Sequence, residues 1–226
     1  MSEGFYRAPE SFRFEDLDQA YRSELPDDKS TPILDIGCGH GRVLAFLSGR
    51  GYTDVRGVDR DEEVLKWAAA NVTPNVEVVS DLSGYLARHE GEFGLIVLKD
   101  VLYYLPKAEV PALLRGVWKA TAPGGRVLLE TFNGAAWTGP YVAYKDPDIQ
   151  WIPTETLLRY YLERAGFSEI VLRGRATTIK GLKSRVFAAA QALWRMGLRL
   201  AFFLERGMDS QNPRILTTRI IASARR

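Results

Sequence analysis

Cysteine and histidine are scarce in this chain of 226 residues, which holds one cysteine, Cys38, and two histidines. A single cysteine excludes a disulfide framework and is compatible with a reducing compartment. No cluster of cysteine and histidine has the ligand spacing of a zinc site. Because histidine is a common general base near neutral pH, its scarcity leaves only His40 and His89 in that class.

Long apolar runs are also missing. No stretch of about 18 residues is free of charged side chains, which disfavours a membrane-spanning helix. Residues 1–7 lack the apolar core of a secretory signal, and no repeat recurs along the chain. The hydrophobic content of 46% is ordinary for a globular protein. We therefore expect one cytoplasmic domain covering residues 1–226.

Glycine is concentrated at one informative place. A short apolar run, Ile33–Ile36, carries Asp35 and leads into Gly37, Gly39 and Gly41, and a helix-compatible run begins at Arg42. Glycines at a strand-to-helix turn adopt positive φ cheaply and leave room for a ligand against the backbone. The dinucleotide fingerprint needs glycine where Arg42 stands, so a related nucleoside-binding turn is favoured.

Further segments follow in order: Gly57-Val58-Asp59, Val76 to Leu82, Phe93 to Asp100 and Ala122 to Leu129. With the glycine turn, they resemble the ordered motifs of class I S-adenosylmethionine-dependent methyltransferases over residues 30–131. The resemblance implies an enzyme that binds S-adenosyl-L-methionine, with Asp59 on the ribose hydroxyls and Asp81 near the adenine amine. The full set of implied cofactor-binding residues is Tyr6, Arg7, Asp35, Gly37, Cys38, Gly39, Asp59, Arg60, Asp81, Leu82 and Lys99.

The same resemblance and the alternation of apolar runs with helical patterns predict an α/β fold. We expect a Rossmann-like doubly wound sheet, mostly parallel with an antiparallel last strand, and a helical insertion before that strand. Strands are expected near 33–36, 54–59, 75–80, 93–98, 125–131, 167–172 and 215–222, and helices near 42–49, 61–71, 107–120 and 154–165. Residues 132–153 are expected to form an active-site loop, and 180–208 a basic helical insertion.

Segments outside the cofactor core resemble methyltransferases of bacterial surface-polysaccharide biosynthesis. These are Phe5 to Ala8, Glu130 to Asn133 and Trp151 to Leu158, although Phe132 stands where that group has proline. The resemblance implies O-methylation of a sugar or glycan by in-line methyl transfer. Two alternatives stay open: methylation of a lipid, quinone or other small molecule at the membrane surface, and a cofactor-binding pseudoenzyme that serves as a scaffold.

An alcohol acceptor must lose a proton during methyl transfer, which calls for a base. Asp100, just past the fourth strand, and Tyr104 are the catalytic candidates, because both fall at the mouth of the expected cleft. His40 lies in the cofactor turn and His89 at a surface helix end, so both are weaker candidates. We expect no metal, although Asp100, Glu130 and Asp146 or Asp148 could together hold magnesium.

Charge is unevenly distributed. From Arg173 onward there are 12 basic and two acidic residues, a net charge of +10, so the preceding part carries −8 of the total of +2. Within residues 180–208, Arg195, Arg199 and Arg206 share one helical face, and leucines share the opposite face. This segment could cap its own domain or a second subunit, or contact an anionic membrane at the inner face or a lipid-linked substrate. Nucleic acid is disfavoured, and the oligomeric state stays open.

Overall fold

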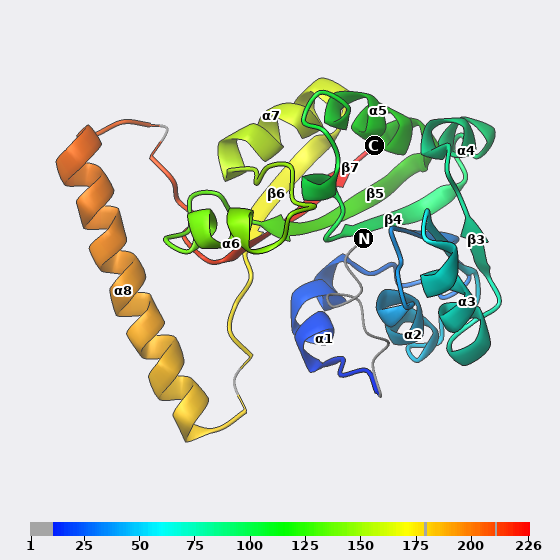
Figure 1. Ribbon diagram of the computed structural model, residues 1–226, viewed down its shortest axis with the longest axis horizontal. Helices are drawn as coiled ribbons and strands as arrows, with labels where there is room; N and C mark the ends of the chain where they lie inside the picture. The colour runs from blue at the N-terminus through cyan, green and yellow to red at the C-terminus, as the bar shows by residue number, and fades with distance from the viewer. Residues whose placement is uncertain (1–10, 179, 211) are drawn as a thin grey trace.

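The computed structural model describes residues 11–178, 180–210 and 212–226, and residues 1–10, 179 and 211 lie outside the description. A seven-stranded sheet runs in the order β3-β2-β1-β4-β5-β7-β6 (Figure 1). Strand β7 is antiparallel to both neighbours, while the first five strands pair in parallel. The predicted fold class is therefore confirmed.

The parallel strands are short and apolar, as expected for strands covered on both faces. The seven strands are β1 Ile33–Ile36, β2 Val55–Asp59, β3 Val76–Val78, β4 Phe93–Lys99, β5 Thr121–Phe132, β6 Ser168–Gly174 and β7 Arg219–Arg225. The helices are α1 Glu15–Tyr21, α2 Arg42–Ser48, α3 Glu62–Asn71, α4 Leu82–Arg88, α5 Val110–Ala120, α6 Gly139–Lys145, α7 Glu155–Ala165 and α8 Leu182–Arg206. Three-residue 3₁₀ turns cover Arg22–Glu24 and Leu102–Tyr104.

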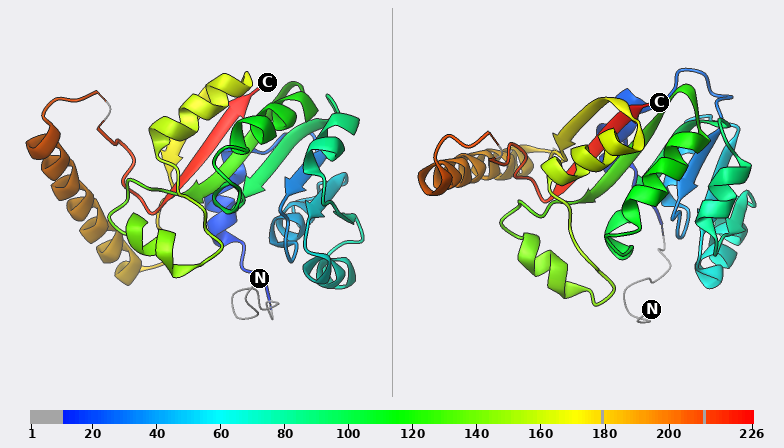
Figure 2. Two further views of the ribbon diagram at one scale, coloured as in Figure 1. Left: turned by 45° about the horizontal axis from the view of Figure 1, so that its top comes forward. Right: turned by 90° about the horizontal axis from the view of Figure 1, so that it is seen from above.

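Two apolar layers cover the sheet. One packs α4, α5 and α7 against one face, and the other packs α1, α2 and α3 against the opposite face (Figures 1 and 2). The strands supply both layers because successive side chains point to opposite faces: Ile33 belongs to the second layer and Leu34 to the first. The edge of the sheet where the parallel strands end is thereby left open for a ligand.

The predicted helix boundaries agree with local capping. Asp61 accepts hydrogen bonds from the backbone N–H groups of Glu63 and Val64 at the start of α3. Thr154 caps α7 in the same way through Leu157, and Gly166 ends that helix in the left-handed region, at φ 107°. These side chains satisfy donors that a helix end leaves free, so local sequence is sufficient to set the boundaries.

Several boundaries differ from those that the sequence pattern predicts. The segment 132–153 contains α6, β5 begins at Thr121 rather than near 125, and β7 begins at Arg219 rather than at 215. The shift of β7 has a clear cause: the Asn133 amide donates to the carbonyls of Ile215 and Thr217, each at 2.8 Å. Side chains thus occupy backbone groups that a longer strand would need.

Candidate active site

The carboxyl ends of β1, β2, β3 and β4 border a cavity of about 600 Å³. Gly37 follows β1, Asp59 ends β2, Asp81 follows β3, and Lys99 ends β4. This is the edge at which open parallel sheets bind their ligands. The cavity volume lies within the range of small-molecule and cofactor sites.

The glycine turn has the backbone geometry that its sequence predicts. Gly37, Gly39 and Gly41 all have positive φ, at 70°, 53° and 80°. A Cβ at Gly37 would come within 2.5 Å of a Val101 methyl carbon, so a side chain is excluded sterically as well as conformationally. The turn therefore requires glycine at Gly37 if it is to keep its place between β1 and the segment after β4.

Asp59 organises the wall opposite this turn. One carboxylate oxygen accepts the backbone N–H of Gly39 at 2.9 Å, and the other accepts that of Asp61 at 3.1 Å. A carboxylate offers about four lone-pair positions, so both oxygens can still accept hydrogen bonds from a ligand in the cavity. The side chain thus joins the glycine turn to β2 and fits a diol such as a ribose.

Asp35 is a buried carboxylate behind the same turn. It is 1% exposed, and its Oδ2 atom has no hydrogen-bond partner within the described structure. Burial raises its pKa to about 8, and the partly opposing attraction of Lys99 does not restore the ordinary value. A ligand with positive charge would compensate this group, and S-adenosylmethionine carries a sulfonium and an ammonium. The residues present therefore fit that cofactor.

Cys38 and Gly57 explain how the turn packs. A Cβ at Gly57 would come within 2.8 Å of the Cys38 sulfur, so a small side chain must meet a bare backbone here. Burial raises the pKa of the Cys38 thiol far above its usual range, which disfavours a thiolate. The side chain is buried and does not line the cavity, so it supports the turn by packing.

The remaining residues implied by the resemblance fall into three groups. Gly37, Gly39, Asp59, Arg60, Asp81, Leu82 and Lys99 line the cavity. Asp35 and Cys38 lie behind that lining, and Tyr6 and Arg7 lie outside the described residues. Asp81 also caps α4 by accepting the backbone N–H of Gly84 at 2.9 Å, which holds its carboxylate at the cavity rim.

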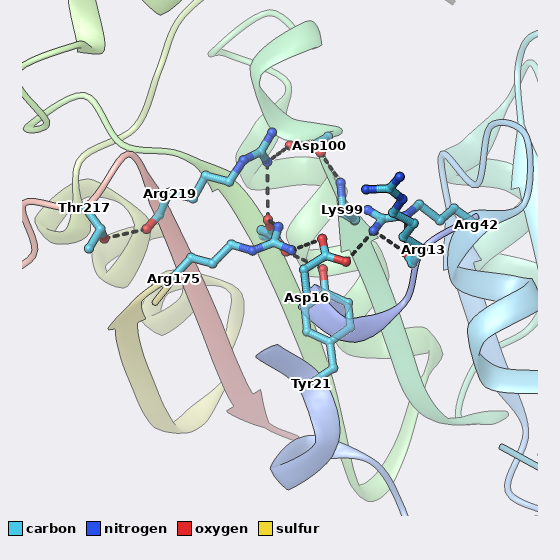
Figure 3. A network of polar contacts seen from close by, with 10 residues as sticks. Arg13, Asp16, Tyr21, Arg42, Lys99, Asp100, Arg175, Thr217 and Arg219 are labelled. Carbon is cyan, nitrogen blue, oxygen red and sulfur yellow. Dashed lines mark hydrogen bonds and ion pairs between the residues drawn. The ribbon is translucent and has the colours of Figure 1, made fainter. Parts of the chain in front are cut away.

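Asp100 lies on the cavity wall with an unusual backbone. Its φ is 62°, a left-handed value that aspartate tolerates better than most residues. One carboxylate oxygen pairs with Lys99 and the other with Arg219 (Figure 3). Burial would raise the pKa of Asp100, but attraction to Lys99 and Arg219 outweighs it, so the pKa lies below its ordinary value. Its role as a base stays a prediction, and this environment weakens its basicity.

A chain of ion pairs continues from Asp100 into the protein. Arg219 and Arg175 both contact Glu130, which is 1% exposed and also accepts the Tyr21 hydroxyl at 2.6 Å. Arg175 reaches on to Asp16, which meets Arg42 from α2 (Figure 3). The network joins β5, β6, β7, α1 and α2 beneath the cavity wall.

The sequence pattern does not predict this network, apart from a catalytic role for Asp100 and a candidate metal role for Asp100 and Glu130. Its members are far apart in sequence, and Arg175 to Asp16 spans 159 positions. Glu130 inside the apolar run of β5 is the sequence feature that indicates such a network, because a buried charge requires a partner of opposite charge.

Tyr104 forms the other polar feature of the cavity wall. Its hydroxyl donates to Asp146 Oδ2 at 3.0 Å, and Asp146 is a buried carboxylate just past α6. Asp148 lines the cavity as well, so the 132–153 segment does reach the mouth of the site. Tyr104 thus places a hydroxyl at the cavity with the buried carboxylate of Asp146 behind it, and the pair could pass a proton away from a ligand.

The two histidines lie away from the cavity lining. His40 packs edge-on against Trp67 with ring centroids 5.2 Å apart, and burial lowers its pKa. His89 stacks on Tyr85 at 4.2 Å, with Nδ1 at 2.9 Å from that residue's carbonyl oxygen. Within the described part of the chain, no group of three or more candidate ligands could hold a metal ion.

Residues 10–171 match the family model described as a methyltransferase domain, which is more than half of the chain. The chain belongs to this methyltransferase family. It is an enzyme fold whose cofactor is S-adenosylmethionine, as predicted, and similar solved folds hold that compound or S-adenosylhomocysteine.

Individual relatives are more distant. An uncharacterized methyltransferase of Synechocystis sp. is 28% identical over 144 residues, which cover 61% of this chain and 67% of that protein. A ubiquinone biosynthesis O-methyltransferase of Thiobacillus denitrificans is 31% identical over 106 residues, covering 45% of this chain and 44% of the enzyme. The chain thus spans less than half of that enzyme's length.

Among solved structures, a SAM-dependent methyltransferase from Archaeoglobus fulgidus has a TM-score of 0.69 at 19% identity, with 94% of each chain covered. At that identity the likeness concerns the fold. The family and the cofactor are therefore established at the level of the whole domain, while the acceptor must be argued from the cavity.

Proposed function

We propose that this methyltransferase transfers a methyl group to a hydroxyl oxygen, with Tyr104 and Asp146 as the proton-accepting pair. The observation that carries the proposal is the hydrogen bond from Tyr104 to the buried Asp146 at the cavity wall, 3.0 Å long. An amine acceptor would need only its neutral form, whereas a hydroxyl acceptor needs a group that takes its proton during transfer.

The chain's own residues divide the work. S-adenosylmethionine supplies a methyl group made electrophilic by its sulfonium. Asp59 and the glycine turn hold and orient the cofactor, and Asp35 offers negative charge behind the turn. Tyr104 accepts the acceptor's proton at its hydroxyl oxygen while its own proton moves to Asp146. Alignment of this kind can lower a barrier by about 7–11 kcal/mol in favourable cases.

Asp100 is better suited to electrostatic positioning than to proton abstraction. Both of its oxygens are engaged, by Lys99 and by Arg219, and its pKa is lowered. A base works best when its pKa is near the working pH, and a paired carboxylate is far below it. Tyr104 and Asp100 were both catalytic candidates, and the contacts favour the first.

The first candidate acceptor is a sugar or the end of a glycan. The cavity lining includes Tyr104, Glu109 and Asp148, which combine a flat aromatic ring with carboxylates. Rings can cover the face of a sugar, and carboxylates accept hydrogen bonds from several hydroxyls at once. This supports O-methylation of a polyhydroxylated acceptor.

The second candidate is a lipid-linked ring such as a quinone precursor. It is favoured by the partial match to an enzyme named for ubiquinone biosynthesis and by the apolar residues Val101 and Leu105 on the same wall. A scaffold without activity is less favoured, because the cavity retains its carboxylates and its glycine turn.

A panel assay with methyl-labelled cofactor tests this proposal. Sugars, phenols and amines are offered separately, and transfer to a hydroxyl compound is expected. Tyr104→Phe should lower turnover about 10²–10⁴-fold, the usual range for acid–base catalysis. Tyr160→Phe, at a tyrosine of α7 that is 50% exposed, is the matched control and should not change turnover. Transfer to amines alone, or normal turnover of Tyr104→Phe, would refute the proposed chemistry.

A further inference from the structure

Helix α8 does not pack into the hydrophobic core of the domain. It spans Leu182–Arg206, and none of its residues is buried. In Figures 1 and 2 it stands at the edge of the molecule, apart from the sheet and its covering helices. A helix of 25 residues is roughly 38 Å long at 1.5 Å per residue, so this is a large surface to leave in water.

The exposed side of α8 is its apolar side. Large apolar residues recur at intervals of three and four, which places them on one face. Phe187 and Trp194 are also more than half exposed but lie to one side of this face, and the exposed residues on the face itself are Leu182, Val186, Leu193, Met196, Leu200 and Leu204. We name these six residues the apolar stripe.

The opposite side of α8 is turned towards the molecule. The partly buried residues on that side are Ser184, Ala188, Gln191, Arg195, Leu198 and Phe202. Thr177 donates to the Gln191 side chain at 2.5 Å. Of the three arginines that share one helical face, Arg195 is partly buried on this side, while Arg199 and Arg206 are exposed. The orientation leaves the apolar stripe free for another partner.

Exposed aromatic side chains extend this surface to α6. Trp137 packs edge-on against Trp194 of α8, with ring centroids 5.9 Å apart. Trp137, Tyr141 and Tyr144 are 70%, 74% and 90% exposed. Exposed apolar patches of this extent mark interaction sites, and tryptophan and tyrosine are typical of the membrane interface.

The charge around the apolar stripe selects the partner. Residues 180–210 hold six basic and two acidic side chains: Lys180, Lys183, Arg185, Arg195, Arg199 and Arg206 against Glu205 and Asp209. Lys183 and Arg185 flank the stripe and make no ion pair within the described residues. A second copy of the chain would bring like charges together, whereas an anionic lipid surface would neutralise them.

We propose that the apolar stripe of α8, together with Trp137, Tyr141 and Tyr144, is a docking surface for an anionic lipid bilayer. The helix lies in the plane of the interface with the stripe among the acyl chains and with Lys183 and Arg185 at the headgroups. No helix in the described part of the chain is long and apolar enough to cross a bilayer, so the contact is peripheral.

This placement has a consequence for the active site. The α6 segment that carries the aromatic residues also carries Asp146, which bonds Tyr104, and Asp148, which lines the cavity. The aromatic part of the docking surface and the residues at the mouth of the cavity thus lie on one segment of the chain, residues 137–148. Docking itself requires no particular acceptor, so it can be tested apart from the proposed reaction.

Flotation of the full chain with vesicles tests the docking surface. Binding is expected to vesicles of mixed phosphatidylglycerol and phosphatidylcholine and to weaken as salt is raised, because screening acts within about 8–10 Å at 0.1–0.15 M ionic strength. Leu193→Gln with Leu200→Gln should weaken binding on the order of a hundredfold. Lys183→Gln with Arg185→Gln should weaken it about thirtyfold, at about 1 kcal/mol for each charge.

The matched control removes two charges elsewhere. Arg115 and Lys119 are exposed residues of α5, and Arg115→Gln with Lys119→Gln should bind vesicles as the unchanged chain does. Each variant is first checked for stabilisation by S-adenosylhomocysteine, which reports an intact cavity. Vesicle binding uses no acceptor, so its failure is distinct from failure of the proposed reaction.

Three results would overturn the docking surface. The unchanged chain could ignore all vesicles, it could bind neutral and anionic vesicles equally, or the charge control could lose as much binding as Lys183→Gln with Arg185→Gln. Sedimentation then addresses a second copy: a dimer that ignores vesicles and becomes monomeric in the leucine variant would assign the stripe to self-association.

Discussion

At the scale of single residues, carboxylates in and around the cavity differ because their partners differ. Asp59 accepts two backbone N–H groups, Asp100 is held between two cations, and Asp35 has an oxygen without a partner among the residues that the structure describes. A carboxylate can therefore orient a ligand, as at Asp59, hold charge in place, as at Asp100, or bind a cationic ligand, as at Asp35. Each role has its own test.

Removing the Asp59 carboxylate should weaken cofactor binding. Asp59→Ala is expected to reduce the affinity for S-adenosylhomocysteine by about 1.5–3 kcal/mol, the scale for hydrogen bonds to a charged group. Calorimetry measures the change, and Asp27→Ala, at an exposed site, serves as the control. An unchanged affinity would show that Asp59 does not hold the ribose.

The two catalytic candidates can be separated at Asp100. Asp100→Asn keeps the shape of the side chain but loses the pairs with Lys99 and Arg219. If the carboxylate positions charge, turnover should fall less than about tenfold; if it is the base, the fall should reach about 10²–10⁴-fold. We expect the smaller effect, measured as turnover at saturating cofactor with cofactor affinity determined in parallel.

The raised pKa of Asp35 makes cofactor binding dependent on pH. Its pKa rises from 3.8 to about 8 in the folded chain, so the folded state holds a proton that the unfolded state has lost between those values. The stability of the cofactor-free chain therefore falls as pH rises through this window. Binding of a cationic cofactor should ionise Asp35 and release close to one proton at pH 7.

Calorimetry in buffers of different ionisation enthalpy counts that proton. Affinity for S-adenosylmethionine should rise with pH up to about 8, where Asp35 ionises without the cofactor. Asp35→Asn should bind with no proton release from this site. Release that is zero in the unchanged chain would mean that Asp35 is already ionised.

At the scale of elements, the ion-pair network ties the end of the sheet together. Glu130 in β5 meets Arg219 of β7, Arg175 just after β6 and Tyr21 of α1. These elements come from both ends of the chain. A buried charge with several partners fixes their relative positions more than an apolar contact would.

Neutralising Glu130 should therefore destabilise the whole fold. Glu130→Gln takes a buried carboxylate from Arg219 and Arg175, which keep Asp100 and Asp16, and is expected to cost about 3 kcal/mol of unfolding free energy, the lower end for a broken buried ion pair. Glu92→Gln, which loses a pair with the half-exposed Arg56, should cost at most about 1 kcal/mol. Urea unfolding of both variants gives the comparison, and equal costs would contradict a central role for Glu130.

At the scale of the whole molecule, the catalytic domain and α8 are nearly separate. The domain buries its apolar residues in two layers over the sheet, whereas α8 buries none. Contacts that join them include the Trp137–Trp194 pair and the bond from Thr177 to Gln191. Such a helix contributes little to folding, so its sequence is free to serve an interaction.

Replacing residues 182–208 by a flexible linker should leave the domain folded. The melting temperature is expected to fall by no more than a few degrees, because only partly exposed contacts are lost. Stabilisation by S-adenosylhomocysteine should persist, since the cavity lies at the ends of β1 to β4. A large loss of stability would show that α8 is a structural cap.

Local sequence is sufficient to predict the turn and the helix caps that border the cavity. The glycine turn, Asp59 and the caps Asp61 and Thr154 act through backbone geometry within a few residues, so local pattern is sufficient to predict them. Tertiary structure decided the rest. The Glu130 network, the Tyr104–Asp146 pair and the start of β7 depend on residues far apart in sequence, and their partners are chosen only when the sheet is assembled. The outward face of α8 was decided in the same way, because helical periodicity defines two faces but not which of them meets water.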